Sequence, residues 1–217
     1  MFLNLEKAAD KKGLMKLPNS IYKTATLMLA GYLSLMTYVR AQDNPTAIQP
    51  AHKTQDQSQA PDAGYDPEAK LKELGIELIP PSAPVANYVH AVRTGNLIFL
   101  SGKGPKKADG ENITGKVGAD LSIEEGYEAA RVVGINQLSV LKAELGNLNK
   151  VKRIVKVLGM VNCTTEFTDQ PKVVNGYSDL MVEVFGERGK HARAAVGMGS
   201  LPGNIAIEVE MIVEVEE

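Results

Sequence analysis

The sequence has no tryptophan, one cysteine and few other aromatic residues, with seven tyrosines and four phenylalanines among 217 residues. A single cysteine excludes a disulfide within the chain. Cys163 could serve as a nucleophile only beside a base such as histidine, and the three histidines form no recognisable pattern with it. We therefore expect Cys163 to be a small residue of the hydrophobic core.

The sequence also has no excess of basic residues: 24 Lys and Arg and 26 Asp and Glu give a net charge of -2. Binding to a nucleic-acid backbone depends on clustered Lys and Arg that displace counterions from the phosphates. The sequence contains no such cluster, so we expect no nucleic-acid partner.

The chain contains no hydrophobic run of the ~20 residues that a membrane span needs. The run without charged residues between Lys23 and Arg40 has 16 residues. A basic, polar segment precedes it, and Val39-Arg40-Ala41 follows with the small-x-small pattern of a signal peptidase site. A transmembrane anchor is the alternative, but the short length favours a secretory signal peptide over residues 15–41, cleaved near Ala41.

The segment 1–14 precedes Met15, and it is either an over-called start or a long basic lead to the signal peptide. Residues 1–41 hold six of the 24 basic and two of the 26 acidic residues, so cleavage would leave 18 basic and 24 acidic residues. We expect an acidic, exported protein without a membrane span. A bacterial periplasm is the predicted location, and a protein without disulfides is compatible with it.

Residues 42–66 are rich in Gln, Asp and Pro and have hardly any large apolar side chains, which predicts a disordered linker. Asp66 followed by Pro67 is typical of the start of a helix, and Gly75 is typical of its end. We therefore expect a folded domain over residues 67–217.

The pattern of the domain predicts strands and two long helices in alternation. Ser122 and Glu125 form a capping box at the start of the first long helix, and Gly146 ends it. The predicted strands are 87–94, 96–102, 151–163, 192–199 and 204–215, and the predicted long helices are 122–145 and 168–185.

This order predicts an α+β sandwich in which both helices cover one face of a single sheet. The strand 151–163 is apolar on both faces. We expect Val155, Val157 and Val161 on one face, and Ile154, Leu158 and Met160 on the other. Because the chain has no third long helix, we infer that other subunits cover the second face.

Several short motifs, in this order, resemble the reactive-intermediate deaminase (RidA/YjgF) family, over about residues 81–215. The motifs are Asn87-Tyr88-Val89, Gly95-Asn96, Leu100-Ser101-Gly102 with Pro105, Val174-Asn175-Gly176-Tyr177, Ala192-Arg193, and Leu201-Pro202 followed by Ile207-Glu208-Val209-Glu210.

The resemblance implies a chorismate-mutase-like fold, one mixed sheet with two helices on one face, assembled as a homotrimer with a pocket at each subunit interface. It also implies hydrolysis of reactive enamines and imines, such as 2-aminoacrylate, to 2-keto acids and ammonia, without metal or organic cofactor. A trimeric module that binds small molecules or protects proteins through the same pocket, without turnover, is the alternative.

The resemblance also implies roles for particular residues. Arg193 would hold the carboxylate of the substrate, because its planar guanidinium matches a carboxylate in a two-pronged way. Glu208 would orient the attacking water and take its proton. Tyr88, Ser101, Gly102 and Asn175 would line the substrate pocket.

Structural roles are open for the same residues. Arg193 could pair with Glu208 or another acid at an interface, and Glu208 fits equally well on a solvated acidic face of the last strand. Tyr88 could pack at a strand edge, and Ser101-Gly102 could only permit a tight bend. The chain also departs from the family pattern, with His191 for a proline, Lys103 for a glutamine and Ala195 for a cysteine, which predicts a divergent branch.

Overall fold

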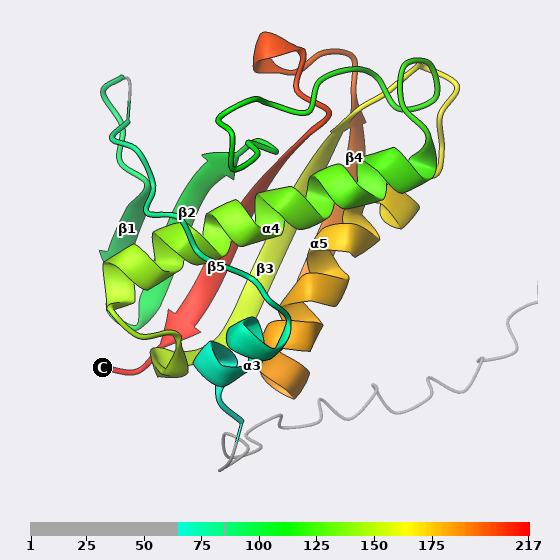
Figure 1. The fold of residues 1–217 in the computed structure, drawn as a ribbon. Coiled ribbons are helices and arrows are strands. Elements are labelled where there is room, and N and C mark those ends of the chain that lie inside the picture. The colour runs from blue at the N-terminus through cyan, green and yellow to red at the C-terminus, as the bar shows by residue number, and fades with distance from the viewer. Residues whose placement is uncertain (1–64, 85) are drawn as a thin grey trace, which may run out of the picture. The chain divides into compact units, whose positions relative to one another are not determined.

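In a computed structural model that describes residues 65–84 and 86–217, five strands form one mixed sheet (Figure 1). The strands lie in the order β1 (Ala91–Thr94), β2 (Leu97–Lys103), β5 (Ile207–Val215), β3 (Val151–Asn162) and β4 (Ala192–Met198). The pairs are antiparallel except β3 and β4, which are parallel. All described residues belong to one unit of residues 58–217, so the predicted signal peptide and nearly all of the predicted linker lie outside them.

Two long helices, α4 (Ile123–Leu145) and α5 (Gln170–Phe185), cover one face of the sheet, and a short helix, α3 (Pro67–Glu73), lies beside them (Figure 1). The predicted capping box forms, since Ser122 and Glu125 each accept a hydrogen bond from the other's backbone N–H. Gly146 ends α4 in the left-handed conformation, with φ 73°. The α+β fold and the two helices on one face are therefore confirmed. The short 3-10 segments are Leu148–Lys150, Gly186–Gly189 and Pro202–Asn204.

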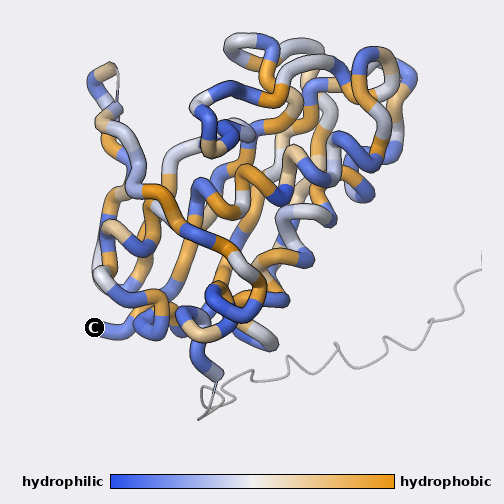
Figure 2. The backbone as a smooth tube through the Cα atoms, viewed as in Figure 1, coloured by the Kyte–Doolittle hydropathy of each residue, from blue (hydrophilic) through white to orange (hydrophobic). Residues whose placement is uncertain are grey.

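The core lies between the sheet and the two long helices. Along β5 the buried residues alternate with partly or fully exposed ones. Figure 2 shows how apolar (orange) and polar (blue) residues are distributed along the backbone. Met211 and Val209 face the helices, and Tyr177 of α5 donates a hydrogen bond to the Met211 sulfur. Glu208 and Glu210 consequently point away from the helices, onto the open face. Cys163 is 5% exposed and belongs to the core, as predicted.

The faces predicted for β3 were partly wrong. A bulge between Ile154 and Lys156 shifts the register against β5, so Ile154 and Val157 are both buried under the helices. Leu158 and Met160 lie on the opposite, open face and are only partly buried. A bulge adds one residue and reverses the alternation that a sequence pattern assumes.

The open face carries exposed apolar side chains in the single chain. Val92 of β1, Phe99 of β2 and Val196 of β4 are 56%, 43% and 40% exposed. Val92 pairs with Phe99, which pairs with Ile212, so the three side chains form one row across the sheet. No described helix covers this face (Figure 1).

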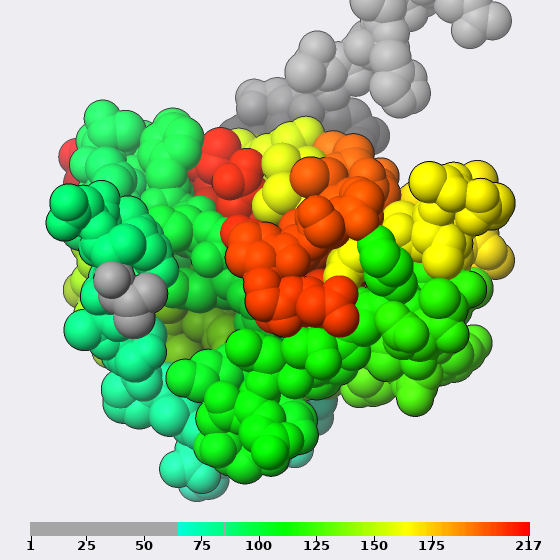
Figure 3. Space-filling view, turned by 90° about the horizontal axis from the view of Figure 1, so that it is seen from above, coloured from blue at the N-terminus to red at the C-terminus, as the bar shows by residue number. Residues whose placement is uncertain are grey.

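The connection 199–206 lies at the surface beside an earlier loop (Figure 3). Its orange-red segment contacts the green segment 104–121, because Gly115 donates to the Asn204 carbonyl and Thr114 bridges to Ile205. No helix in the part of the chain described here is long and apolar enough to cross a membrane.

Candidate functional site

Arg193 lies on β4, at the edge of the sheet, with its side chain on the helix side. In the register it pairs with Val157, which pairs with Met211, and both of these residues are buried under the helices. Its Nη1 donates hydrogen bonds to Asn175 Oδ1 at 2.9 Å and to Ser178 Oγ at 3.0 Å. Asn175 and Ser178 are three residues apart on α5 and so present both oxygens on one face of that helix.

The charge of Arg193 has no acidic partner among the residues that the structure describes, since no carboxylate lies within 4.0 Å of its nitrogens. Both hydrogen-bond acceptors are neutral oxygens. A guanidinium has five N–H donors, and only those of Nη1 have a partner among the described residues. The described residues of one chain therefore contain no ion pair to Arg193, and a pairing across an interface stays an alternative.

His191 joins this cluster through Ser178. The Gly189 carbonyl lies 2.7 Å from His191 Nδ1 and can only accept a hydrogen bond, so Nδ1 carries the proton. The neutral Nε2, at 3.1 Å from Ser178 Oγ, then accepts the hydroxyl proton of Ser178. Burial lowers the pKa of His191, the Gly189 carbonyl partly opposes this, and the charge of Arg193 lowers it further. The neutral ring thus holds Ser178 with its lone pairs toward Arg193.

Glu208 lies on β5 and points to the open face, beside Met160 of β3. Its carboxylate occupies the space above Gly102, where any side chain would overlap it. Burial raises the pKa of Glu208, and the charge of Glu210 raises it further. The absence of a side chain at Gly102 is therefore what allows the Glu208 carboxylate to rest against the backbone of β2.

Ser101 precedes Gly102 of this second group, and Tyr88 lies in the segment that Ser101 contacts through Val89. Ser101 Oγ donates a hydrogen bond of 2.6 Å to the Val89 carbonyl, so its proton is already used and its lone pairs remain as acceptors. Tyr88 is 48% exposed and precedes β1, because the strand begins only at Ala91. The prediction of a strand from residue 87 was wrong, since residues 86 and 87 form a bend and residues 88 and 89 have no regular structure.

Lys103 and His90 form a contact that the sequence pattern did not indicate. Lys103 Nζ lies 2.6 Å from His90 Nδ1, and His90 Nε2 lies 2.6 Å from the Ser82 carbonyl. The ammonium can only donate, so Nε2 carries the ring proton and donates to Ser82. Burial lowers the pKa of Lys103. This pair ties the segment that carries Tyr88 to Lys103, at the end of β2.

The structure therefore places the predicted site residues in two groups. Arg193 and Asn175 meet at the edge of the sheet, on the helix side, and Ala195 packs against the core nearby. Glu208 and Gly102 meet on the open face, with Ser101 beside them. Strand β3 separates β4 from β5, so one chain does not bring the two groups into one pocket.

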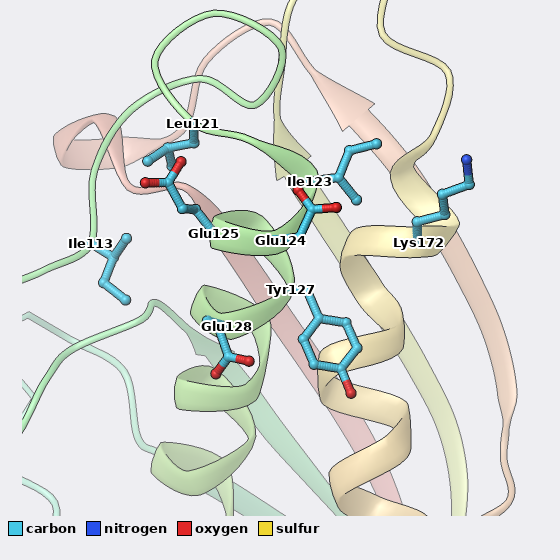
Figure 4. Close-up of a pocket in the computed structure, with 8 residues that line it drawn as sticks. All are labelled: Ile113, Leu121, Ile123, Glu124, Glu125, Tyr127, Glu128 and Lys172. Carbon is cyan, nitrogen blue, oxygen red and sulfur yellow. The ribbon is translucent and has the colours of Figure 1, made fainter.

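A depression of about 630 Å³ lies elsewhere, at the first turns of α4, and none of the predicted site residues lines it (Figure 4). Of its three carboxylates, Glu125 belongs to the capping box, and Glu124 and Glu128 are exposed. The hydroxyl of Tyr127, which also lines it, donates to Asp179 at 3.0 Å. No group of three or more His, Cys, Asp or Glu that could hold a metal occurs among the described residues.

Comparisons with known proteins agree with this fold. A family model described as "YjgF/chorismate mutase-like, putative endoribonuclease" matches residues 68–215. Protein TCP17 of Trypanosoma cruzi is 46% identical over 147 residues, which cover 67% of this chain and 92% of that protein. A 2-iminobutanoate/2-iminopropanoate deaminase of Dermatophagoides farinae is 30% identical over 134 residues, which cover 61% of this chain and 89% of the deaminase.

One solved structure is similar in both sequence and fold. Atu1372, a protein of unknown function from Agrobacterium tumefaciens, is 42% identical, with a TM-score of 0.63 over 70% of this chain and 94% of that one. The domain over residues 68–215 is thus nearly as long as its relatives.

Proposed function

Because the chain belongs to the YjgF/chorismate mutase-like family, we propose that it hydrolyses imines and enamines of 2-keto acids to the keto acid and ammonia. The observation that carries the proposal is the Arg193 guanidinium, which is held by two neutral oxygens and has no acid beside it within the described residues. The similarity to a 2-iminobutanoate/2-iminopropanoate deaminase supports the same reaction class.

The active assembly in this proposal is a homotrimer. The open face exposes apolar side chains, Phe99 and Val92 among them, that water-soluble chains normally bury. Packing this face against another copy would cover it, and it would bring the Glu208 group of one copy to the edge of its neighbour. Each pocket would then take Arg193 from one subunit and Glu208 from the next.

Arg193 would bind the carboxylate of the imine through the N–H groups of Nε and Nη2, because Nη1 already donates to Asn175 and Ser178. Asn175 and Ser178 hold the guanidinium through Nη1, so the planar cation is already oriented when the substrate binds. The pKa of His191 is lowered, so its ring stays neutral at pH 7. The neutral ring accepts the Ser178 proton and thereby keeps Ser178 in position beside Arg193.

Glu208 would activate the water. The carboxylate takes one proton from water as the oxygen attacks the imine carbon, and the C=N bond becomes a C–N single bond in a carbinolamine. That proton then passes to the nitrogen, which completes the carbinolamine. The hydroxyl proton of the carbinolamine follows to the same nitrogen as the C=O bond forms, so the C–N bond breaks and ammonia leaves with the keto acid. A raised pKa makes Glu208 a stronger base than an ordinary glutamate. The reaction moves only water and protons, so the proposal includes no cofactor.

A coupled assay tests this function. Amino-acid oxidases convert several amino acids to imines, and the release of 2-keto acid is followed with and without the protein. We expect the protein to accelerate keto-acid release over the spontaneous rate. Binding of a 2-keto acid without any acceleration would instead show the non-catalytic binding module.

A further inference from the structure

The β2–β5 ladder is interrupted opposite Glu210, next to the position where the Glu208 side chain rests on Gly102. Leu100 pairs with Met211, and the next pair is Lys103 with Val209. Two residues of β2, Ser101 and Gly102, therefore face a single residue of β5, which defines a bulge. A bulge leaves one residue without its ladder partner, so something else must fix its position.

Gln137 of α4 supplies hydrogen bonds at this bulge. Its side chain is completely buried, and its Nε2 donates to the Ser101 carbonyl at 3.1 Å and to the Val209 carbonyl at 2.8 Å. Both acceptors are carbonyls, so only the NH₂ end of the amide can occupy this position. One amide group thus joins the bulged residue of β2 to the residue that follows Glu208 on β5.

The other end of the amide gives a second observation. Gln137 Oε1 is buried and has no hydrogen-bond partner among the described residues. A buried polar atom without a partner destabilises a fold. The unpaired Oε1 therefore offsets part of what the two donated bonds contribute, and the role of the side chain at this position is to hold the two carbonyls through its NH₂ group.

We propose that Gln137 is a positioning residue that fixes the Ser101–Gly102 backbone against Glu208, an inference that rests on the proposed role of Glu208. The bulge turns the Ser101 carbonyl to the helix side, where Gln137 binds it. That leaves Gly102 beneath the Glu208 carboxylate, which fills the space that a side chain at Gly102 would occupy. Without the two hydrogen bonds from Gln137, the Ser101–Gly102 backbone can shift relative to the strand that carries Glu208.

The experiment compares Gln137→Leu with Ser139→Ala in the assembled protein. Leucine keeps the apolar volume and removes both donated bonds, whereas Ser139 gives up a buried bond to Ile135 within the same helix. Carbon-13 NMR of the Glu208 carboxyl follows its titration. We expect the pKa of Glu208 to change in Gln137→Leu and to match the wild type in Ser139→Ala.

Kinetics provide the second measurement. We expect kcat for imine hydrolysis to fall about 10- to 100-fold in Gln137→Leu with KM little changed, because misplacing a catalytic group weakens chemistry more than carboxylate binding. Should Gln137→Leu fail to fold, Gln137→Asn keeps the amide but shortens its reach and is expected to show the same two changes.

A wild-type Glu208 titration in the folded Gln137 variant overturns the positioning role, whatever the activity. If the wild-type protein does not hydrolyse any imine, the proposed function fails, and the titration alone still decides the role of Gln137.

Discussion

Arg193 and Glu208 lie on opposite faces of one sheet, and strand β3 runs between the strands that carry them. Arg193 faces the helices and contacts Asn175, whereas Glu208 rests over Gly102 on the open face. A pocket that uses both residues therefore needs a second copy of the chain, and the predictions below follow from that geometry.

Assembly should depend on the open face. Phe99→Glu puts a charge into the row formed by Val92, Phe99 and Ile212, so we expect the variant to be mostly monomeric and inactive. Light scattering gives the mass directly. Val182→Glu is the matched control, because Val182 is 37% exposed on α5, away from this face, and should leave the trimer intact. A stable wild-type monomer at micromolar concentration would refute the assembly.

Arg193→Lys keeps the positive charge but loses the planar fork held by Asn175 and Ser178. Loss of such a partner typically costs about 2–5 kcal/mol, a rate loss on the order of 30-fold or more if the transition state bears it. We expect weaker binding of a 2-keto acid, measured by calorimetry, and slower turnover. Unchanged binding and turnover would exclude Arg193 as the carboxylate anchor.

Glu208→Gln should behave differently, because it keeps the shape of the side chain and removes the base. We expect binding of the keto acid close to the wild type and a large loss of kcat. A variant that turns over imines at the wild-type rate would place Glu208 on a merely solvated acidic face.

The pH dependence of stability gives an independent test of Glu208. Its pKa is raised in the folded state, chiefly by burial, so the folded state binds more protons than the unfolded state between the two pKa values. Stability therefore falls as pH rises from about 4.3 through the folded pKa. We expect Glu208→Gln to have a higher Tm than the wild type at pH 7 and a similar Tm at pH 4. The exposed Glu144→Gln should show no such difference.

The N-terminal residues carry a separate prediction. If residues 15–41 are a signal peptide, the mature protein begins near Gln42 and lies outside the cytoplasm. Mass spectrometry of cell fractions measures both, and Leu33→Arg, which interrupts the hydrophobic stretch, should block export. An intact segment on the cytoplasmic wild-type protein would contradict the assignment.

The sequence predicted the elements whose signals are local. The capping box of Ser122 and Glu125 and the left-handed Gly146 fixed the limits of α4 within a residue, because those signals act within one turn of a helix. The alternation of β5 likewise predicted that Glu208 and Glu210 face away from the core.

Features that depend on contacts between distant segments were not predictable. The bulge that puts Ile154 on the same face as Val157 arises from the register with β5, and no residue type in β3 indicates it. The bond from Gln137 to Ser101 spans 36 positions, and a lone glutamine in an amphipathic helix gives no signal of it. The split of Arg193 and Glu208 between two faces likewise appears only once the strand order is known.

Mixed assemblies test the central claim most directly. Arg193→Lys and Glu208→Gln chains, each nearly inactive alone, are coexpressed with different tags, and trimers that contain both are isolated and assayed. If each pocket takes Arg193 from one subunit and Glu208 from the next, every trimer that contains both variants has one pocket of its three with both native residues. We therefore predict activity of about a third of the wild type in the isolated mixed trimers. Activity no higher than that of the separate variants would show that the two residues do not form one site between subunits.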